Sequence, residues 1–186
     1  MQSIDHWLHF YAARVLLMLN LQDAAVERLH LALKCNPQFD RAASSLGFIY
    51  ASIRQYPVAT RYFEQALQIN PQAAGVWFNL GFIHEEQKYY SRAIEAFRQA
   101  VTHNPKIDRA WYGMGLAHAA LGEHEKAAEA FQEAATLQPM SPYPWYQLGM
   151  AHHHLNHPDK VAEIIAYLER FDPKMTQQLK NDTRNT

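Results

Sequence analysis

The sequence predicts an all-α chain in which five tandem helix pairs stack into a solenoid. Three observations support this class: a 34-residue period without insertions, small residues at fixed places in each period, and a helical spacing of the apolar residues. A fixed period of this length is typical of stacked repeat proteins. We expect repeats at 6–39, 40–73, 74–107, 108–141 and 142–175, forming a single domain over 1–175, with a polar C-terminal tail at 176–186.

Five columns of residues define the period. In order of place they are Trp77, Trp111 and Trp145 (fourth); Ala13, Gly47, Gly81, Gly115 and Gly149 (eighth); Ala25, Ala59, Ala93, Ala127 and Val161 (twentieth); Ala32, Ala66, Ala100, Ala134 and Leu168 (twenty-seventh); and Pro37, Pro71, Pro105, Pro139 and Pro173 (thirty-second). Two helices approach closely only where the side chains between them are small, so the Gly and Ala columns predict helix contacts. We expect a large residue to fill the gap at each glycine, as Trp111 and Phe131 would at Gly115.

Each repeat divides into two helices. Trp77, Leu80 and His84 are spaced three and four apart, so they share one helix face. The chain should then turn at Lys88 and at the equivalent Asn20, Arg54, Gly122 and Asn156. Gly and Asn accept the left-handed conformation that ends a helix, which Arg and Lys adopt less readily. The proline column ends the second helix, because proline disfavours helical backbone in the preceding residue.

This pattern closely resembles the tetratricopeptide repeat (TPR), and the likeness covers about 170 of the 186 residues. The resemblance implies a right-handed α-solenoid whose first helices line a concave groove that binds a peptide or helix of a partner protein. It also implies which places face the groove. They hold Phe10, Tyr11, Arg14, Arg41, Ser44, Ser45, Phe48, Phe78, Asn79, Phe82, Glu85, Arg109, Tyr112, Leu116, Tyr143, Tyr146, Gln147, Met150 and His153.

The expected groove is rich in aromatic residues and poor in charge. Protein-binding sites favour aromatic residues, Arg and Met, so the set indicates a protein partner, although some of the rings could serve only to pack neighbouring repeats. The ninth places hold Phe48, Phe82, Leu116 and Met150, which would form an apolar strip. Some family members bind a chaperone tail through a carboxylate clamp. Only Asn79 and Arg109 match that clamp, so the sequence does not support this partner.

Other function classes receive little support. The net charge is −1 and the 17 Lys and Arg are dispersed, which argues against nucleic-acid binding. The glycines are single and periodic, and no phosphate loop or nucleophile motif occurs, so we expect neither an enzyme nor a cofactor. His153 and His157 have the spacing of a metal-binding pair, but only Asp159 is near enough to complete a set, and we predict no metal site. His84, His118 and His152 share the eleventh place and should pack between helices.

Self-assembly is the alternative function. The first helix (Trp7, Leu8, Phe10, Leu17) and the last (Val161, Ile164, Ile165, Leu168) are apolar, and we expect the polar tail to be too short to cover the latter, so either helix could join a second copy. Residues 7–21 resemble a signal sequence, but no positive residue precedes them and Arg14 interrupts them. We therefore assign them to the first repeat and expect a cytoplasmic protein. Cys35 is single and should be buried, which fits a reducing compartment.

Overall fold

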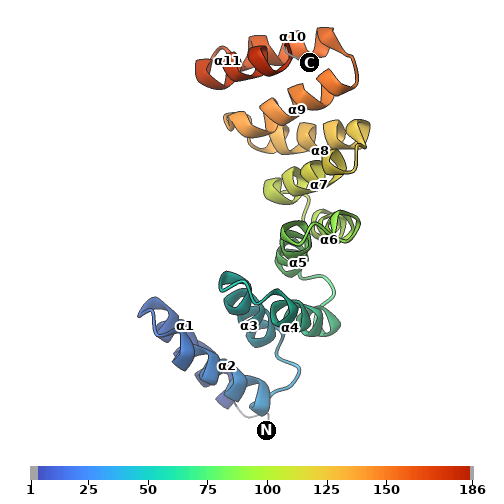
Figure 1. Cartoon of the computed structure of the whole chain (residues 1–186). Coiled ribbons are helices and arrows are strands. Elements are labelled where there is room, and N and C mark those ends of the chain that lie inside the picture. The colour runs from blue at the N-terminus through green and yellow to red at the C-terminus, as the bar shows by residue number, and fades with distance from the viewer. Residues whose placement is uncertain (1–3, 185–186) are drawn as a thin grey trace. The chain divides into compact units, whose positions relative to one another are not determined.

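The computed structural model describes residues 4–184, which contain eleven α-helices and no strand. Each expected repeat holds one pair of consecutive helices, and α11 follows the fifth pair (Figure 1). The helices are α1 (Asp5–Met18), α2 (Gln22–Cys35), α3 (Asp40–Ser52), α4 (Tyr56–Ile69), α5 (Ala74–Glu86), α6 (Tyr90–His103), α7 (Asp108–Ala120), α8 (His124–Leu137), α9 (Pro142–His154), α10 (Pro158–Leu168) and α11 (Pro173–Asp182). In the segment assigned to the first repeat, α1 packs on α2.

The chain forms two compact units, Met1–Ile83 and His84–Thr186, and the boundary falls within α5. In the first unit, α1 packs on α2, α2 on α3 and α3 on α4. In the second unit, each helix from α6 to α11 packs on the next, and α11 also contacts α9. The single domain expected over 1–175 stays a prediction.

The alanine columns lie at the helix contacts. Ala25, Ala59, Ala93 and Ala127 are all fully buried. Phe63 and Phe131 supply the large side chains: a Cβ added to Gly47 would lie 2.6 Å from the ring of Phe63, and one added to Gly115 would lie 2.6 Å from the ring of Phe131. The expectation that Phe131 fills the gap at Gly115 is therefore confirmed.

The tryptophan column has another role. The indole nitrogens of Trp77, Trp111 and Trp145 donate hydrogen bonds of 2.8, 2.9 and 3.0 Å to the carbonyl oxygens of Pro71, Pro105 and Pro139. Each tryptophan thus ties the start of its helix to the proline turn that closes the preceding repeat. At Gly115 the nearest side chain is Phe131, since the three atoms nearest an added Cβ all belong to its ring.

The turns within the pairs follow the expected column. Asn20, Arg54, Lys88 and Asn156 have φ of 60°, 59°, 62° and 56°, and Gly122 has 75°, so all five adopt the left-handed conformation. The next amide closes each turn on the helix, as Gln55 does on the carbonyl of Tyr50 at 2.9 Å and Tyr89 on that of His84 at 2.8 Å. Arg54 and Lys88 adopt this conformation although it strains a residue with a Cβ by about 1–2 kcal/mol.

The C-terminal residues correct the sequence analysis. Residues 176–182, expected as a polar tail, belong to α11. Asp172 caps that helix by accepting a 2.8 Å hydrogen bond from the Met175 amide. Leu179 is fully buried and lies 2.7 Å from the position of a Cβ on Gly149. The apolar flank expected on α10 is covered, since Val161, Ile164 and Leu168 are at most 7% exposed.

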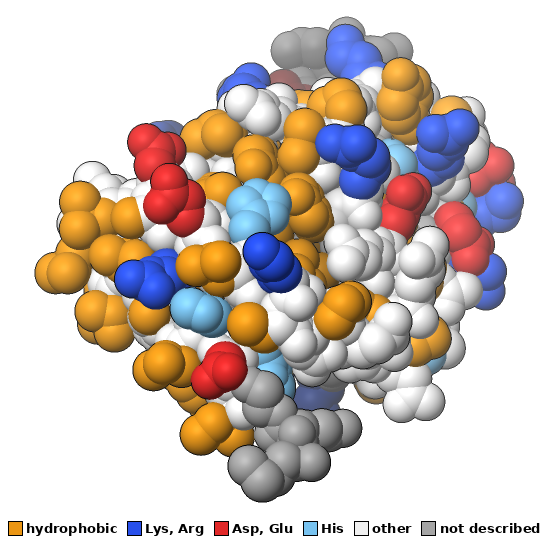
Figure 2. All heavy atoms as spheres, turned by 90° about the horizontal axis from the view of Figure 1, so that it is seen from below, with side chains coloured by type: hydrophobic (Ala, Val, Ile, Leu, Met, Phe, Trp, Pro, Cys, Tyr) orange, Lys and Arg blue, Asp and Glu red, His pale blue; other side chains and the backbone are white. Residues whose placement is uncertain are grey.

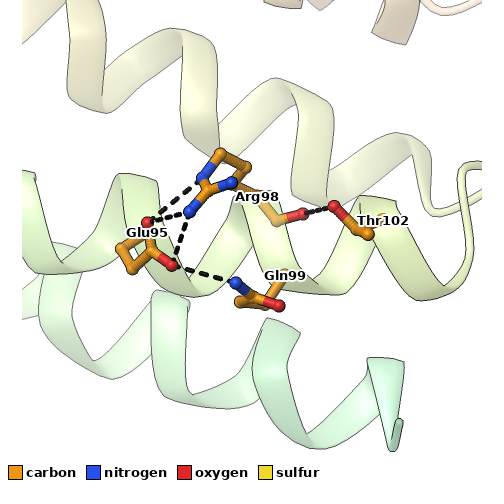
Figure 3. Close-up of polar contacts among 4 residues, drawn as sticks. All are labelled: Glu95, Arg98, Gln99 and Thr102. Carbon is orange, nitrogen blue, oxygen red and sulfur yellow. Dashed lines mark hydrogen bonds and ion pairs between the residues drawn. The ribbon is translucent and has the colours of Figure 1, made fainter.

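The exposed face of α6 carries a cluster of polar side chains. On α6, Arg98 forms a 2.6 Å ion pair with Glu95, Gln99 donates to the same carboxylate at 3.0 Å, and Thr102 donates to the Arg98 carbonyl (Figure 3). The hydrogen bonds from Gln99 and Arg98 lower the pKa of Glu95. Such exposed pairs contribute only about 0.2–0.5 kcal/mol each. Cys35, expected to be buried, is the exposed last residue of α2.

Candidate functional site

In the second unit, three of the expected groove residues line one open pocket. Arg109 and Tyr112 come from the first turns of α7, and Tyr143 comes from the start of α9. The pocket has a volume of about 190 Å³, and its remaining walls are Asp108, Ala134, Gln138, Ser141 and Pro144. Arg109 and Tyr143 are exposed, and Tyr112 is half-buried. A partner could therefore meet two phenol rings and a guanidinium group in the same place.

A polar contact lies beside this pocket. The Tyr112 side chain forms a hydrogen bond with that of Gln147, and the Glu85 carboxylate is near enough to act on it electrostatically. Burial raises the pKa of Tyr112, and the hydrogen bond with Gln147 opposes the rise. Burial also raises the pKa of Glu85, and the adjacent Glu86 carboxylate adds to it. Glu85, an expected groove residue, is half-buried.

Other expected groove residues of the second unit serve mainly to pack the repeats. Leu116, Tyr146 and Met150 are half-buried against the core that Phe131, Leu148 and Leu179 form. The Tyr146 hydroxyl donates a 2.7 Å hydrogen bond to Asp182 of α11. Burial raises the pKa of Tyr146, and the bond to Asp182 raises it further. At these positions the side chains therefore pack neighbouring repeats, which was the alternative to partner binding.

In the first unit, Tyr11, Arg14 and Arg41 gather around Trp7. Trp7 stacks on Tyr11 with ring centroids 5.8 Å apart, and the Arg41 guanidinium lies 5.4 Å from the Trp7 ring. The Arg14 guanidinium lies 5.9 Å from the Tyr11 ring. Sequence reasoning did not place Trp7 on this surface. Its position one helical turn before Tyr11 is the signal that could have done so.

The remaining expected residues of this unit differ in exposure. Phe48 and Phe82 are 61% and 46% exposed, whereas Phe78, Asn79, Ser44 and Ser45 are half-buried. The hydroxyls of Ser44 and Ser45 donate to the Arg41 carbonyl at 3.1 and 2.7 Å. Phe10 is a correction, because it is only 7% exposed and lies in the core beside Phe39, with ring centroids 5.2 Å apart.

The histidines form contacts with one another and with Glu123. His118 is buried, and its Nδ1 lies 2.6 Å from Glu123, as expected for a packed eleventh-place residue. His157 contacts His152, with 3.4 Å between the Nδ1 atoms, and not the His153 that its spacing suggested. The His154 ring stacks on that of His124 at 4.5 Å. Among residues 4–184, no three His, Cys, Asp or Glu side chains are placed to hold one metal ion.

The sequence matches a known protein family. The family model for the tetratricopeptide repeat matches residues 49–102 and 86–143, which together span half of the chain. The chain belongs to the tetratricopeptide repeat family. A comparison with curated proteins finds no significant match.

Several solved structures resemble this TPR chain at 19% sequence identity. One is a MamA protein with a TM-score of 0.79, covering 98% of this chain and 95% of that one. A second is YrrB, described as a TPR protein with an unusual peptide-binding site, with a TM-score of 0.80 and coverage of 93% and 90%. A third is MamA from Desulfovibrio magneticus RS-1, at 19% identity, with a TM-score of 0.78 and 98% coverage of both chains. These likenesses confirm the predicted all-α TPR solenoid fold.

Within residues 4–184, no helix is both long enough and apolar enough to cross a membrane.

Proposed function

We propose that this TPR protein is an interaction module that binds a peptide or helix of a partner protein on the inner faces of its first helices. The observation that carries the proposal is the pocket in the second unit, where Arg109, Tyr112 and Tyr143 converge. All three hold places that the repeat register assigns to the groove. Tyrosine buries much area at small entropic cost, and arginine offers several hydrogen-bond donors, so protein-binding sites are enriched in both residues.

The pocket also suggests what the partner segment offers. Its walls are mainly the two phenol rings, Ala134 and Pro144, with the Arg109 guanidinium among them. An apolar or aromatic side chain fits the rings, and a nearby carboxylate of the partner would pair with Arg109. A charge-assisted hydrogen bond of this kind contributes about 1.5–3 kcal/mol. One short segment should bind with a dissociation constant around 1 μM, which corresponds to about 8 kcal/mol.

A peptide selection tests the proposal. The full chain is immobilised, a random peptide library is selected on it, and the recovered peptides are titrated calorimetrically. Arg109→Ala and Tyr143→Ala should each weaken binding by about tenfold, which is 1.4 kcal/mol. Tyr89→Ala is the matched control, because Tyr89 is an exposed tyrosine of the same unit outside the pocket. Peptides that bind both pocket variants as tightly as the wild type would exclude this site.

Self-assembly remains the second candidate, in reduced form. Self-assembly through α10 loses its support, because α11 covers the apolar side of that helix. Self-assembly through α1 gains support, since Leu8 and Leu17 on that helix are 68% and 37% exposed. YrrB is described as a TPR protein with an unusual peptide-binding site, and this favours peptide binding in the groove as the primary function.

A further inference from the structure

The exposed face of α1 carries a row of large apolar side chains. Leu8, Tyr11, Val15 and Met18 are spaced three, four and three residues apart, so they lie along one side of the helix. Their exposed fractions are 68%, 51%, 54% and 86%. Ile4 continues the spacing just before the helix and is 77% exposed. These five residues are called the α1 stripe below.

The stripe occupies a stacking position of the repeat. Leu8 and Val15 hold the third and tenth places, where the second repeat has Ala42 and Ile49. Ala42 and Ile49 are 0% and 3% exposed, and the fourth-repeat equivalents, Ala110 and Ala117, are both 0% exposed. They are buried because a second helix of the preceding repeat packs there, α2 on α3 and α6 on α7. Leu8 and Val15 of the α1 stripe hold the same two places without such a helix among residues 4–184.

The surface continues beyond the stripe. Leu17, Leu19 and Leu21, at the turn from α1 to α2, are 37%, 64% and 52% exposed. Figure 2 looks onto the end of the chain where α1 and α2 lie and shows hydrophobic side chains spread over much of it. Soluble monomers rarely expose contiguous apolar patches beyond a few hundred Å². A standard interface takes about 800 Å² from each partner, and the five exposed side chains of the stripe would supply its apolar centre.

The last helix closes the other terminal repeat and is polar outside. Leu179 of α11 points inward and is fully buried, whereas Lys174, Gln177, Gln178 and Asn181 are exposed. A head-to-tail contact would therefore place the apolar α1 stripe against polar side chains. A head-to-head contact places apolar surface against apolar surface.

We propose that the α1 stripe packs against the same stripe of a second copy, giving a head-to-head dimer. A two-fold interface uses one patch twice and closes after two copies, so a self-complementary apolar row suffices. The row itself contains no charge, and α1 carries only Asp5 and Arg14 as ordinary charged residues, so the pairing brings no cluster of like charges together. The proposal does not depend on the pocket of Arg109 and Tyr143.

The molar mass of the full chain tests the dimer. Light scattering from low micromolar to several hundred micromolar protein should show twice the 21.5 kDa of one chain. Leu8→Glu combined with Val15→Glu should return the mass to 21.5 kDa with an unchanged circular dichroism spectrum, because both side chains are more than half exposed. Phe48→Glu is the matched control, since Phe48 is 61% exposed in the same unit but lies off the stripe, and it should dimerise like the wild type.

Cysteine cross-linking tests the orientation. Cys35 is exposed and is first replaced by serine. In that background Tyr11→Cys should form a covalent dimer on oxidation, and Gln178→Cys on α11 should not. A wild-type chain that stays at 21.5 kDa at the highest concentration would overturn the proposal. So would an oligomer that survives the two glutamates, a cross-link that forms only between Tyr11→Cys and Gln178→Cys, or a monomer whose stripe binds phospholipid vesicles instead.

Discussion

The indole nitrogen of Trp111 donates a 2.9 Å hydrogen bond to the carbonyl oxygen of Pro105, six residues earlier. Trp111→Phe keeps an aromatic ring but removes the donor together with part of the indole ring system. It should lower the free energy of unfolding by at least about 0.5–1.5 kcal/mol, the usual net contribution of a hydrogen bond. Urea denaturation followed by circular dichroism measures the change. An unchanged midpoint would mean that water replaces the bond at no cost.

A pair of glycines separates packing from helix propensity. Gly115→Ala places a Cβ 2.6 Å from the Phe131 ring and should destabilise the protein by about 1–3 kcal/mol. Gly75→Ala, in the first turn of α5, meets nothing within 4 Å. It should stabilise the protein by about 0.4–1 kcal/mol, because alanine restricts the unfolded chain. Opposite shifts of the thermal midpoint are expected, and shifts of the same sign would contradict the packing role of the glycine column.

The left-handed turns contain removable strain. Arg54→Gly and Lys88→Gly should each stabilise the protein by about 1 kcal/mol, because glycine adopts their φ of 59° and 62° without a Cβ conflict. Gly122→Ala is the converse, since φ is 75° and nothing lies within 4 Å of its added Cβ, so only the backbone is affected. It should destabilise by about 1 kcal/mol. Chemical denaturation of the three variants measures the changes, and a neutral Gly122→Ala would contradict the backbone argument.

The histidine contacts should make stability depend on pH. Burial lowers the pKa of His152, with a further contribution from His157, and burial followed by His124 lowers that of His154. The folded protein therefore binds fewer protons than the unfolded chain, and the stabilisation is present above the ordinary pKa of 6.5 and lost as pH falls below it. The loss of unfolding free energy between pH 7.5 and pH 5.5, about one unit on each side of the histidine pKa, should be smaller in His152→Gln with His154→Gln. His103→Gln, an exposed histidine of α6, is the control and should retain the wild-type dependence.

The C-terminal helix should be essential to the last repeat. Leu179→Ala removes a fully buried side chain that lies against Gly149 and should cost about 2–5 kcal/mol. Lys174→Ala, exposed on the same helix, is the control and should be nearly neutral. Urea midpoints compare the two variants. Equal stability would show that α11 adds little to the core.

The repeat framework was predictable because its signals are local and occur five times. The turn at Arg54 followed from its alignment with Asn20 and Gly122, although its own residue type argued against a left-handed turn. Phe131 was predictable as the partner of Gly115 for the same reason. Features present only once were not predictable. No column exists for α11, so its one buried leucine, Leu179, resembled part of a polar tail.

The candidate site divides in the same way. The register of the repeats identified Arg109, Tyr112 and Tyr143 as surface residues of the first helices, and they line one pocket. The register could not distinguish Tyr143, which is 62% exposed, from Phe10, which is 7% exposed. Phe10 is buried beside the ring of Phe39, and the same thirty-fourth place holds Ala73, Ile107, Ser141 and Met175 in the later repeats. The burial of a side chain depends on such neighbours, and the aligned places of the repeats do not reveal them.

The position of α11 restricts how arrays of this type can be lengthened. A sixth repeat added after residue 175 would need the space beside Gly149 that Leu179 occupies. Duplication of an inner repeat avoids this conflict, because both new junctions then reuse contacts already present, such as those of α6 with α7. Engineers who want a longer version should therefore insert copies between existing repeats and leave Pro173–Asp182 in place.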